Sequence, residues 1–446
     1  MISQGRAAEA DSATVERHAI DTGNRWADPG LYRELLDRAV ELRRRDPRLP
    51  DFEVVTGERG TPALVVSDEL LVRAEDLAGR ESALPPGSGD PEPVEGTGGR
   101  VLRVRLAPER AGRSVTADRA TLRGGGVAAA YNYVTAMQVV IKSKGGASPA
   151  ARSWPALDRV APADGTVRVA VLDTGVADQQ RGDGWLAGLA RPAGTLGPDD
   201  PGTVDLLDVS PANQLLDAAG GHGTAVTGLV QSEAPSVPLA VYNPIPSDGG
   251  AAETDVAAVL VRAVREAFEA GQSVVVNLSL GTTTVDDTPP LALQGALDTV
   301  EAMAAQAELE VLVVAAAGND GDTRPVWPAA SRGVVAVGAL GQDLTGASWS
   351  SRGIWVDCSV IGDGVLTTYV EGSEDPAFGE PADRFGPDAF ALVYGTSFAA
   401  PQVAGAVARI AAEQKVGLRT ALGRLLADTP RLPDFGRVLA VQPPIG

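Results

Sequence analysis

The sequence predicts an α/β protein, with a parallel β-sheet covered by helices on both faces and a small α+β module before it. From residue 167 onward, apolar strand candidates alternate with segments of helical periodicity, which is the order of elements in such sheets. Residues 51–145 instead combine short strand-like runs with short helical ones. Stretches rich in Pro, Gly and acidic residues separate these parts, as linkers do.

Residues 1–50 are predicted to form an N-terminal polar segment followed by one helix. The pair Asp28-Pro29 has the pattern of a helix N-cap and a first-turn proline. Apolar residues then recur at helical spacing, at Leu31, Leu35, Ala39 and Leu42. We expect this helix to end near Arg45.

Residues 51–150 are predicted to form the α+β module together with its linker. The strand candidates are short and rich in β-branched and aromatic residues, and they lie at 52–55, 63–67, 101–106 and 131–141. The helix candidates lie at 70–78 and 117–122. We expect a flexible link and a second linker where Pro, Gly and polar residues accumulate, at 84–99 and 145–155.

Residues 160–428 are predicted to form the α/β domain, and residues 429–446 a C-terminal tail. The strand candidates are mostly apolar, at 167–172, 237–242, 273–278, 311–316 and 334–337. The helix candidates between and after them lie at 224–233, 253–270, 290–307 and from about 397 to 414. Sheets of this kind place their active sites at the carboxyl ends of the strands.

Composition excludes several classes of partner. The chain carries 38 basic and 58 acidic residues, a net charge of −20, so nucleic acid and anionic membranes are not expected to bind it. The N-terminus lacks the apolar core of a secretion signal, which predicts a cytoplasmic protein unless translation starts further upstream. The single cysteine, Cys358, allows no internal disulfide. We expect a buried structural thiol there, with a nucleophile as the alternative.

Ser397 has the setting of a nucleophile. It lies where a turn of small residues, Gly395-Thr396, becomes a helix of small and apolar residues. A hydroxyl there lies at the positive end of the helix dipole, beside backbone N–H groups that have no partner within the helix. Such donors suit a developing oxyanion. A lone serine in this place is more simply a helix cap, so the functional interpretation depends on residues further upstream.

Asp173 and His222 are the upstream residues that favour catalysis. Asp173 directly follows the first apolar strand, where an aspartate is also a common turn former or helix cap. His222 begins a predicted helix. The chain has only one other histidine, His18, in the polar N-terminal segment. His222 is therefore the one credible histidine base, and a histidine-based metal site is disfavoured.

These residues stand in the order Asp173, His222, Ser397, one of the chain orders of the Ser-His-Asp triad. Around them, residues 160–428 resemble the catalytic domain of the subtilisin-like serine peptidases, the subtilases. The matching segments are Val169-Ala-Val-Leu-Asp173-Thr-Gly175, Gly221-His-Gly-Thr224, Asn277-Leu-Ser-Leu-Gly281, Ala315-Ala-Ala-Gly-Asn319 and Gly395-Thr-Ser-Phe-Ala-Ala-Pro-Gln-Val-Ala-Gly405.

The resemblance implies a serine endopeptidase that works through an acyl-enzyme intermediate. Ser397 would attack the peptide carbonyl, His222 would take its proton, and Asp173 would orient the imidazole and stabilise its charge. Asn319, in isolation a turn residue, would donate to the oxyanion. Two further groups would bind the substrate, one along its backbone and one around the side chain before the scissile bond: Ser279, Leu280 and Gly281, and Ala316, Ala317 and Gly318.

No cofactor is implied by the resemblance, although a structural calcium ion is an open alternative. An acidic stretch at 367–390 precedes Ser397, and its side chains could hold calcium or cover the cleft. A solvated loop is the simpler interpretation. The acidic residues in question are Glu371, Glu374, Asp375, Glu380 and Asp383.

The expected partners are peptide or protein substrates and the protein's own N-terminal region. Subtilases are commonly made with a small α+β propeptide that blocks the cleft, and residues 51–150 have the matching size and position. We therefore expect a prodomain-like module and a zymogen, with a permanent accessory module as the alternative. The rival to the whole interpretation is a catalytically silent peptide-binding pseudo-peptidase. The sequence sets no oligomeric state.

Overall fold

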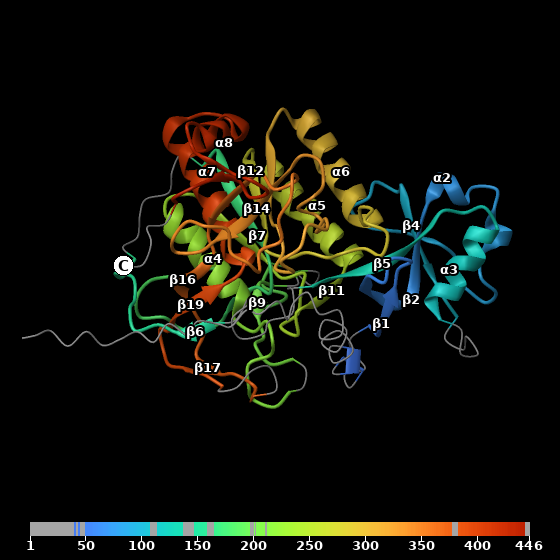
Figure 1. The fold of residues 1–446 in the computed structure, drawn as a ribbon, viewed down its shortest axis with the longest axis horizontal. Helices are drawn as coiled ribbons and strands as arrows, with labels where there is room; N and C mark the ends of the chain where they lie inside the picture. The colour runs from blue at the N-terminus through green and yellow to red at the C-terminus, as the bar shows by residue number, and fades with distance from the viewer. Residues whose placement is uncertain are drawn as a thin grey trace, which may run out of the picture.

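A computed structural model describes residues 40–41, 43–44, 50–107, 114–136, 147–157, 165–196, 200, 202–209, 212–376 and 382–441. Segment 1–27, most of the helix predicted at 28–45, residues 137–141 of a predicted strand and Glu380 lie outside these ranges. Figure 1 shows a central sheet between helices, with a smaller module beyond α5 and α6.

The central sheet has eight strands in the described residues. Their order is β10-β7-β12-β13-β14-β15-β21-β20, and every neighbouring pair is parallel except β20 with β21. The predicted parallel sheet is therefore confirmed. The strands are β7 (Val167–Leu172), β10 (Leu239–Tyr242), β12 (Ser273–Leu278), β13 (Val311–Ala316), β14 (Val334–Leu340), β15 (Cys358–Ile361), β20 (Arg431–Leu432) and β21 (Gly436–Val438).

Helices cover both faces of this sheet, as predicted. Successive side chains of a strand point to opposite faces. Val169 and Val171 of β7 pack in one apolar cluster with α4 and α7, whereas Ala170 and Leu172 pack in another with α5 and α6. This is why the strands are mostly apolar, with Arg168 of β7 and Asn277 of β12 among the exceptions. The helices are α4 (His222–Glu233), α5 (Glu253–Glu269), α6 (Leu291–Ala307), α7 (Ala400–Gln414) and α8 (Leu418–Leu426).

The N-terminal module is a second sheet, packed against α5 and α6. Its strand order is β11-β5-β2-β4-β3, and β1 also pairs with β2. One of these strands, β11 (Gly250–Ala252), comes from the α/β domain, so the two parts share a sheet. The other elements are β1 (Phe52–Thr56), β2 (Pro62–Arg73), α2 (Ala74–Leu77), a 3-10 turn (Glu81–Ala83), β3 (Glu92–Pro93), β4 (Val101–Arg105), α3 (Val115–Gly124) and β5 (Ala129–Ala136).

The helix predicted at 70–78 is wrong over its first half. Strand β2 continues to Arg73, and helix α2 covers only Ala74–Leu77. The polar run before Leu70 resembles a break in sequence, but it lies inside the strand. There Glu69 accepts a hydrogen bond from Asn132 and lies near Arg103. Pairing with β4 and β5 on both sides outweighs local helical periodicity.

The flexible link predicted at 84–99 is also wrong. Within it, β3 pairs with β4. Val94 is buried among residues of α5 and α6, and Thr97 is fully buried. Gly96 adopts a positive φ, and a Cβ there would lie 2.7 Å from the carbonyl oxygen of Ala257. The glycines in this stretch therefore permit close packing against a helix, a role that composition does not distinguish from mobility.

Shorter strands surround the main sheet. Part of the stretch expected as a linker at 145–155 forms β6, which pairs with β19, and part of the expected tail forms β20 and β21. Cys358 is fully buried in β15, as predicted. The remaining elements are β6 (Ala147–Pro149), β8 (Val176–Ala177), β9 (Val204–Asp205), β16 (Asp363–Thr368), β17 (Gly372–Ser373), β18 (Arg384–Phe385), β19 (Phe390–Tyr394) and a 3-10 turn (Thr396–Phe398).

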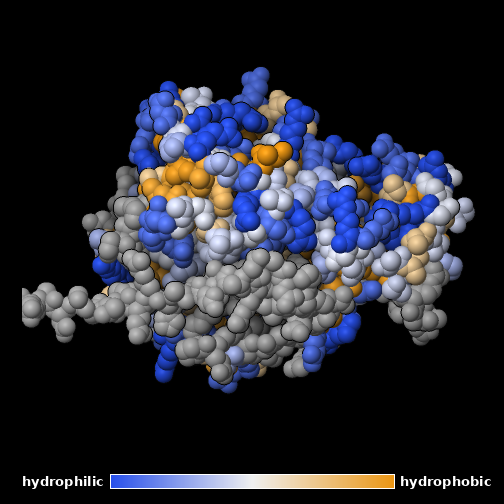
Figure 2. Space-filling view, in the orientation of Figure 1, coloured by the Kyte–Doolittle hydropathy of each residue, from blue (hydrophilic) through white to orange (hydrophobic). Residues whose placement is uncertain are grey.

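The face of the molecule drawn in Figure 2 is mostly hydrophilic where the structure describes it. Figure 2 shows hydrophilic side chains spread over the N-terminal module and the helices on one face, with apolar side chains in small separate areas. Among the described helices, none combines the length and the apolar character needed to span a bilayer.

A buried carboxylate joins the module to the helices. Glu253 is fully buried at the start of α5. Its Oε2 accepts hydrogen bonds from the backbone N–H groups of Ala292 (2.8 Å) and Leu293 (3.1 Å) at the start of α6, and its Oε1 accepts one from Tyr133 in β5 (3.2 Å). One side chain thus caps a neighbouring helix and binds the module.

Replacing Glu253 by glutamine should change how stability depends on pH. Burial raises the pKa of Glu253 from 4.5 to about 7, so the folded protein binds this proton more tightly than the unfolded chain. Its contribution favours folding below about pH 4.5 and is lost as the pH rises to about 7. In Glu253→Gln, thermal unfolding should therefore show a smaller loss of Tm between pH 5 and pH 7.5.

The control is Glu269→Gln, at an exposed position at the end of the same helix. It should keep the pH dependence of the wild type. Equal slopes of Tm against pH in Glu253→Gln and in the wild type would contradict the assignment. At pH 5 the Glu253→Gln variant should also be less stable than the wild type, because its amide nitrogen faces an N–H donor.

Candidate active site

Asp173 and His222 lie together at the carboxyl end of the sheet. Strand β7 ends at Leu172, and α4 begins at His222, so each residue stands at the end of a rigid element. The Nδ1 atom of His222 lies 2.8 Å from Oδ1 of Asp173. Both side chains are buried, with 4% and 0% of their surface exposed. A carboxylate in this position fixes the orientation and the tautomer of an imidazole.

The turn after Asp173 depends on one glycine. Gly175 has a φ of +97°, and a Cβ at this position would lie 2.5 Å from the carbonyl oxygen of Thr203. Only glycine adopts this conformation in so little space. Within the turn, the backbone N–H of Thr174 donates to Oδ1 of Asp173 at 2.8 Å. The turn therefore holds the carboxylate that contacts His222.

Ser397 lies in the 3-10 turn before α7. Its hydroxyl donates to the carbonyl oxygen of Ser279 at 3.2 Å. The next residue, Phe398, is buried, and its ring centroid lies 5.0 Å from that of His222. The structure thus brings together the turns that carry Asp173, His222 and Ser397.

Asn319 is held by the residue before the serine. Its Oδ1 accepts hydrogen bonds from the backbone N–H and the hydroxyl of Thr396, both at 2.9 Å. The same hydroxyl accepts from the backbone N–H of Gly318 at 3.0 Å. These contacts fix the plane of the Asn319 amide next to Ser397. An amide donor held in this way needs no reorganisation when negative charge develops.

The predicted substrate-binding segment 279–281 lies along the edge of the site. Ser279 is fully buried, and its hydroxyl donates to the carbonyl oxygen of Ser397 at 2.7 Å. Leu280 packs in the core with α5 and α6. Gly281 pairs through its backbone with Ala136, the last residue of β5, at 3.0 and 3.1 Å. Side chains of this segment therefore support the site, while its backbone binds a neighbouring strand.

The other side of β5 pairs with β11. Gly250 lies opposite Ala136, and Ala252 lies opposite Val134. The end of β5 is thus held between β11 and Gly281, in antiparallel register with both. Sequence reasoning missed β11 because Gly250–Ala252 is a short run of small residues in a Gly-rich loop. Its role depends on a strand from more than a hundred residues upstream.

The second predicted group, Ala316, Ala317 and Gly318, follows from strand β13 into a turn. Ala316 and Ala317 are buried, with the Ala317 N–H donating to the carbonyl oxygen of Val337. Gly318 has a φ of +104°. Buried Val326 lies against Gly281, where a Cβ would come within 2.7 Å of its side chain. These small residues form a tight wall next to the 279–281 segment.

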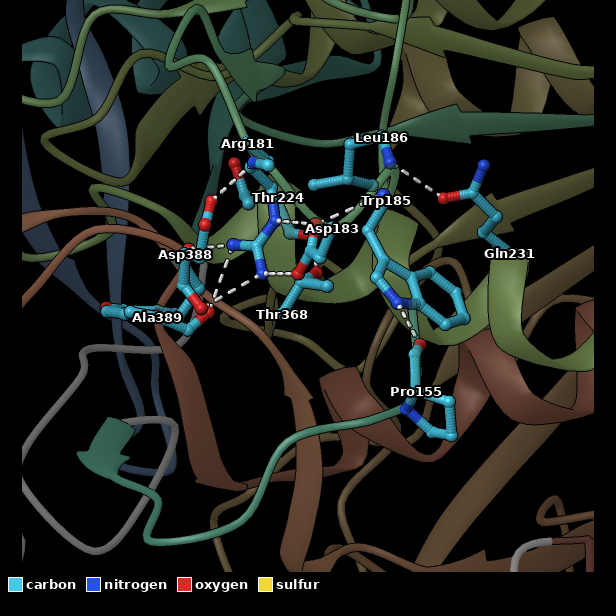
Figure 3. A network of polar contacts seen from close by, with 12 residues as sticks. Pro155, Arg181, Asp183, Trp185, Leu186, Thr224, Gln231, Thr368, Asp388 and Ala389 are labelled. Atoms are coloured by element: carbon cyan, nitrogen blue, oxygen red, sulfur yellow. Dashed lines mark hydrogen bonds and ion pairs between the residues drawn. The ribbon is translucent and has the colours of Figure 1, made fainter. Parts of the chain in front are cut away.

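An arginine ties the acidic stretch before the serine to the loop after Asp173. Arg181 forms two hydrogen bonds with Asp183 and donates to the carbonyl oxygens of Tyr369, Asp388 and Ala389. Figure 3 shows the guanidinium group between these loops. The Arg181 side chain is only 7% exposed. Its hydrogen bonds hold Tyr369, Asp388 and Ala389 to the loop after Asp173.

Two acidic side chains in the described part of this stretch accept hydrogen bonds from the protein. Glu374 accepts from the backbone N–H of Asp383, and Asp375 accepts from the side chain of Asn213. Within the described ranges, no cluster of three or more His, Cys, Asp or Glu side chains is arranged to hold a metal ion.

The sequence matches the model of the Subtilase family over residues 164–430, which is more than half of the chain. The chain belongs to the subtilase family. The match spans the strands, helices and turns that carry Asp173, His222, Asn319 and Ser397.

Similar proteins agree with this membership. Subtilisin BL from Lederbergia lenta is 30% identical over 253 residues, covering 55% of this chain and 76% of that protein. A thermophilic serine proteinase from Bacillus sp. (strain AK1) is 29% identical over 206 residues, covering 43% of each. Fervidolysin from Fervidobacterium pennivorans shares the fold, with a TM-score of 0.56, 18% identity, and 87% and 62% of the two chains covered. The protein is a subtilisin-like serine endopeptidase.

Substitution of Gly223 should disturb the site through the backbone. Gly223 follows His222 in the first turn of α4, and a Cβ there would lie 2.8 Å from the N atom of Gly175 and closer still to its carbonyl oxygen. Both neighbours are backbone, so the helix must shift. We expect Gly223→Ala to lower stability by about 1–3 kcal/mol and to slow labelling of the protein by a fluorophosphonate.

Gly423→Ala is the matched control. Gly423 lies in α8 with nothing within 4 Å of an added Cβ. This change should leave labelling unchanged and raise stability by up to about 1 kcal/mol, because alanine loses less entropy in a helix. Unchanged Tm and labelling in Gly223→Ala would show that the contact with Gly175 is not needed.

Proposed function

We propose that the protein hydrolyses peptide bonds with Asp173, His222 and Ser397 as its triad, through an acyl-enzyme intermediate. The observation that carries the proposal is the buried hydrogen bond between Asp173 and His222. The ring of Phe398, the residue after Ser397, lies next to this imidazole. This pair holds the imidazole as a base for a nearby hydroxyl. Ser397, next in sequence to Phe398, is the hydroxyl proposed for this role.

In the first step, Ser397 attacks the carbonyl carbon of the peptide bond while His222 takes its proton. His222 then gives the proton to the leaving amine, and the acyl group stays on Ser397 until water releases it. Asp173 stabilises the imidazolium that forms in between. The oxyanion is stabilised by the Asn319 amide and by N–H groups at the start of α7.

The substrate is proposed to bind as an extended strand between β11 and the 279–281 segment. Support comes from the end of β5, which pairs there through its backbone with Gly250 on one side and Gly281 on the other. A strand held in this way recognises any peptide backbone, which suits peptide and protein substrates. Gly281 and Ser279 would then align the peptide toward Ser397.

The N-terminal module is proposed to inhibit the enzyme before activation. The end of β5 occupies the two edges that a substrate strand would use. Glu253 and the packing of Leu71, Val94 and Val101 against α5 and α6 hold the module in place. An accessory module that never leaves would also pack here, so removal must be tested directly.

A fluorophosphonate probe tests the enzyme function. The full-length wild type should become labelled at Ser397, and Ser397→Ala should not. Ala136→Pro removes the N–H group that donates to Gly281, so it should label faster than the wild type. If neither the wild type nor Ala136→Pro reacts, the protein is a catalytically silent peptide-binding relative, and the proposed chemistry is wrong.

Mass spectrometry tests the role of the module. If the chain processes itself, purified wild type should yield a product whose new N-terminus lies after Ala136 and before Ala147, since β6 belongs to the sheet with β19. Ser397→Ala should stay intact under the same conditions, because it lacks the nucleophile. A wild type that cleaves peptides while its own chain stays whole would rule out the processing and favour a permanent module.

A further inference from the structure

A second buried carboxylate, that of Asp205, bonds to the turns that carry Asp173 and His222. Asp205 is in β9 and is only 3% exposed. Its Oδ2 accepts hydrogen bonds from the hydroxyl of Thr174 (2.8 Å) and the backbone N–H of Gly221 (2.9 Å). Its Oδ1 accepts from the backbone N–H of Leu207 at 3.0 Å. Three donors thus converge on one buried side chain.

The bonds of Asp205 reach both halves of the pair. Thr174 directly follows Asp173, and Gly221 directly precedes His222. The hydroxyl of Thr174 also accepts from the backbone N–H of Gly223 at 3.0 Å. Gly223, after His222, thus bonds directly to Thr174. Gly221, before His222, is linked to Thr174 through Asp205, which accepts a hydrogen bond from each of them. Asp173 and His222 themselves lie 49 residues apart in the chain.

Burial and the nearby negative charge of Asp173 disfavour the ionised form of Asp205. A positive charge nearby would favour that form. Burial raises the pKa of Asp205 to about 6, and the negative charge of Asp173 contributes in the same direction. The phenol of Tyr369, from the loop after β16, also faces this group, and its hydroxyl donates to the carbonyl oxygen of Gly220. Two further titratable groups lie next to these turns in the described residues: the imidazole of His222 and the buried carboxyl of Asp217, whose backbone oxygen accepts from the N–H of Gly220.

We propose that Asp205 is a positioning residue for the triad, which holds the turns of Asp173 and His222 together and stabilises the imidazolium formed during catalysis. This inference rests on the peptidase function proposed above. Asp205 touches neither the substrate nor the reacting atoms, so it acts through Thr174 and Gly221. The hydrogen bonds from Thr174 and Gly221 to Asp205 maintain the contact between His222 Nδ1 and Asp173. The other ring nitrogen then exchanges its proton with Ser397.

The position of Asp205 predicts a separate electrostatic effect. While ionised, its carboxylate attracts the imidazolium form of His222, because opposite charges stabilise one another strongly at buried sites. Removing the charge destabilises the protonated imidazole, so the base becomes free at a lower pH. The acid limb of kcat/KM against pH must then move to lower pH. A loss of packing alone would not produce this shift.

The test compares Asp205→Asn with the wild type on an N-acylated tetrapeptide p-nitroanilide. The shape of the side chain is kept, and its charge is lost. We expect kcat to fall by about 10- to 100-fold, as for small displacements of catalytic groups, with KM nearly unchanged. The acid limb should move down by about half a pH unit.

Asp217→Asn is the matched control. Asp217 is equally buried in the same region, and its carboxylate accepts hydrogen bonds from Val209 and Ser247. This variant should lose thermal stability without moving the acid limb. If both variants move the acid limb by the same amount, or if Asp205→Asn keeps the wild-type kcat and acid limb, Asp205 has no positioning role.

Thr174→Val keeps the inference testable if Asp205→Asn does not fold. It removes only the hydroxyl between Gly223 and Asp205. We expect a smaller fall in kcat than for Asp205→Asn, again without a change in KM. An unchanged kcat would overturn the inference. A wild type that never reacts with a fluorophosphonate would instead overturn the peptidase function itself, so the two failures are distinguishable.

Discussion

The hydrogen bond between Asp173 and His222 is the contact on which the arrangement of the site depends. It joins the end of strand β7 to the start of helix α4, at a distance of 2.8 Å inside the protein. A buried carboxylate is stable only with such partners. The surrounding backbone accordingly supplies further donors, through Thr174 to Asp173 and through Gly221 to Asp205. The central sheet and the helices on both faces keep these turns in register.

The N-terminal module uses the same edges that bind peptides in our proposal. Strand β5 continues the module sheet into the α/β domain, where it pairs with β11 and ends against Gly281. Backbone pairing of this kind requires no particular side chains, which explains how one surface can serve both an internal strand and an external substrate. Glu253 connects this contact to the start of α6, so docking of the module and capping of the helix share one carboxylate.

The sequence-based predictions agree with the structure where burial leaves a clear local pattern, and they fail where it does not. The strands of the parallel sheet are mostly apolar because both faces are buried, and β7, β12 and β13 were predicted within their observed bounds. Helix α4 begins at His222 because Gly221 adopts a left-handed conformation before it. The errors lie in the module. There, a polar run inside β2 resembles a break, and glycines that permit close packing against α5 resemble those of a mobile link.

Order and residue type along the chain were enough to determine the α/β class and the family resemblance. They also predicted Asp173, His222, Asn319 and Ser397 as site residues, because each stands in a local pattern of strand end, turn or helix start. Tertiary structure alone decided what joins them. The acceptor role of Asp205, the contacts of Thr174 and Thr396, and the place of β11 beside β5 all depend on residues distant in sequence. Such pairings leave no local periodicity, since they arise only when the folded backbone brings donors and acceptors together.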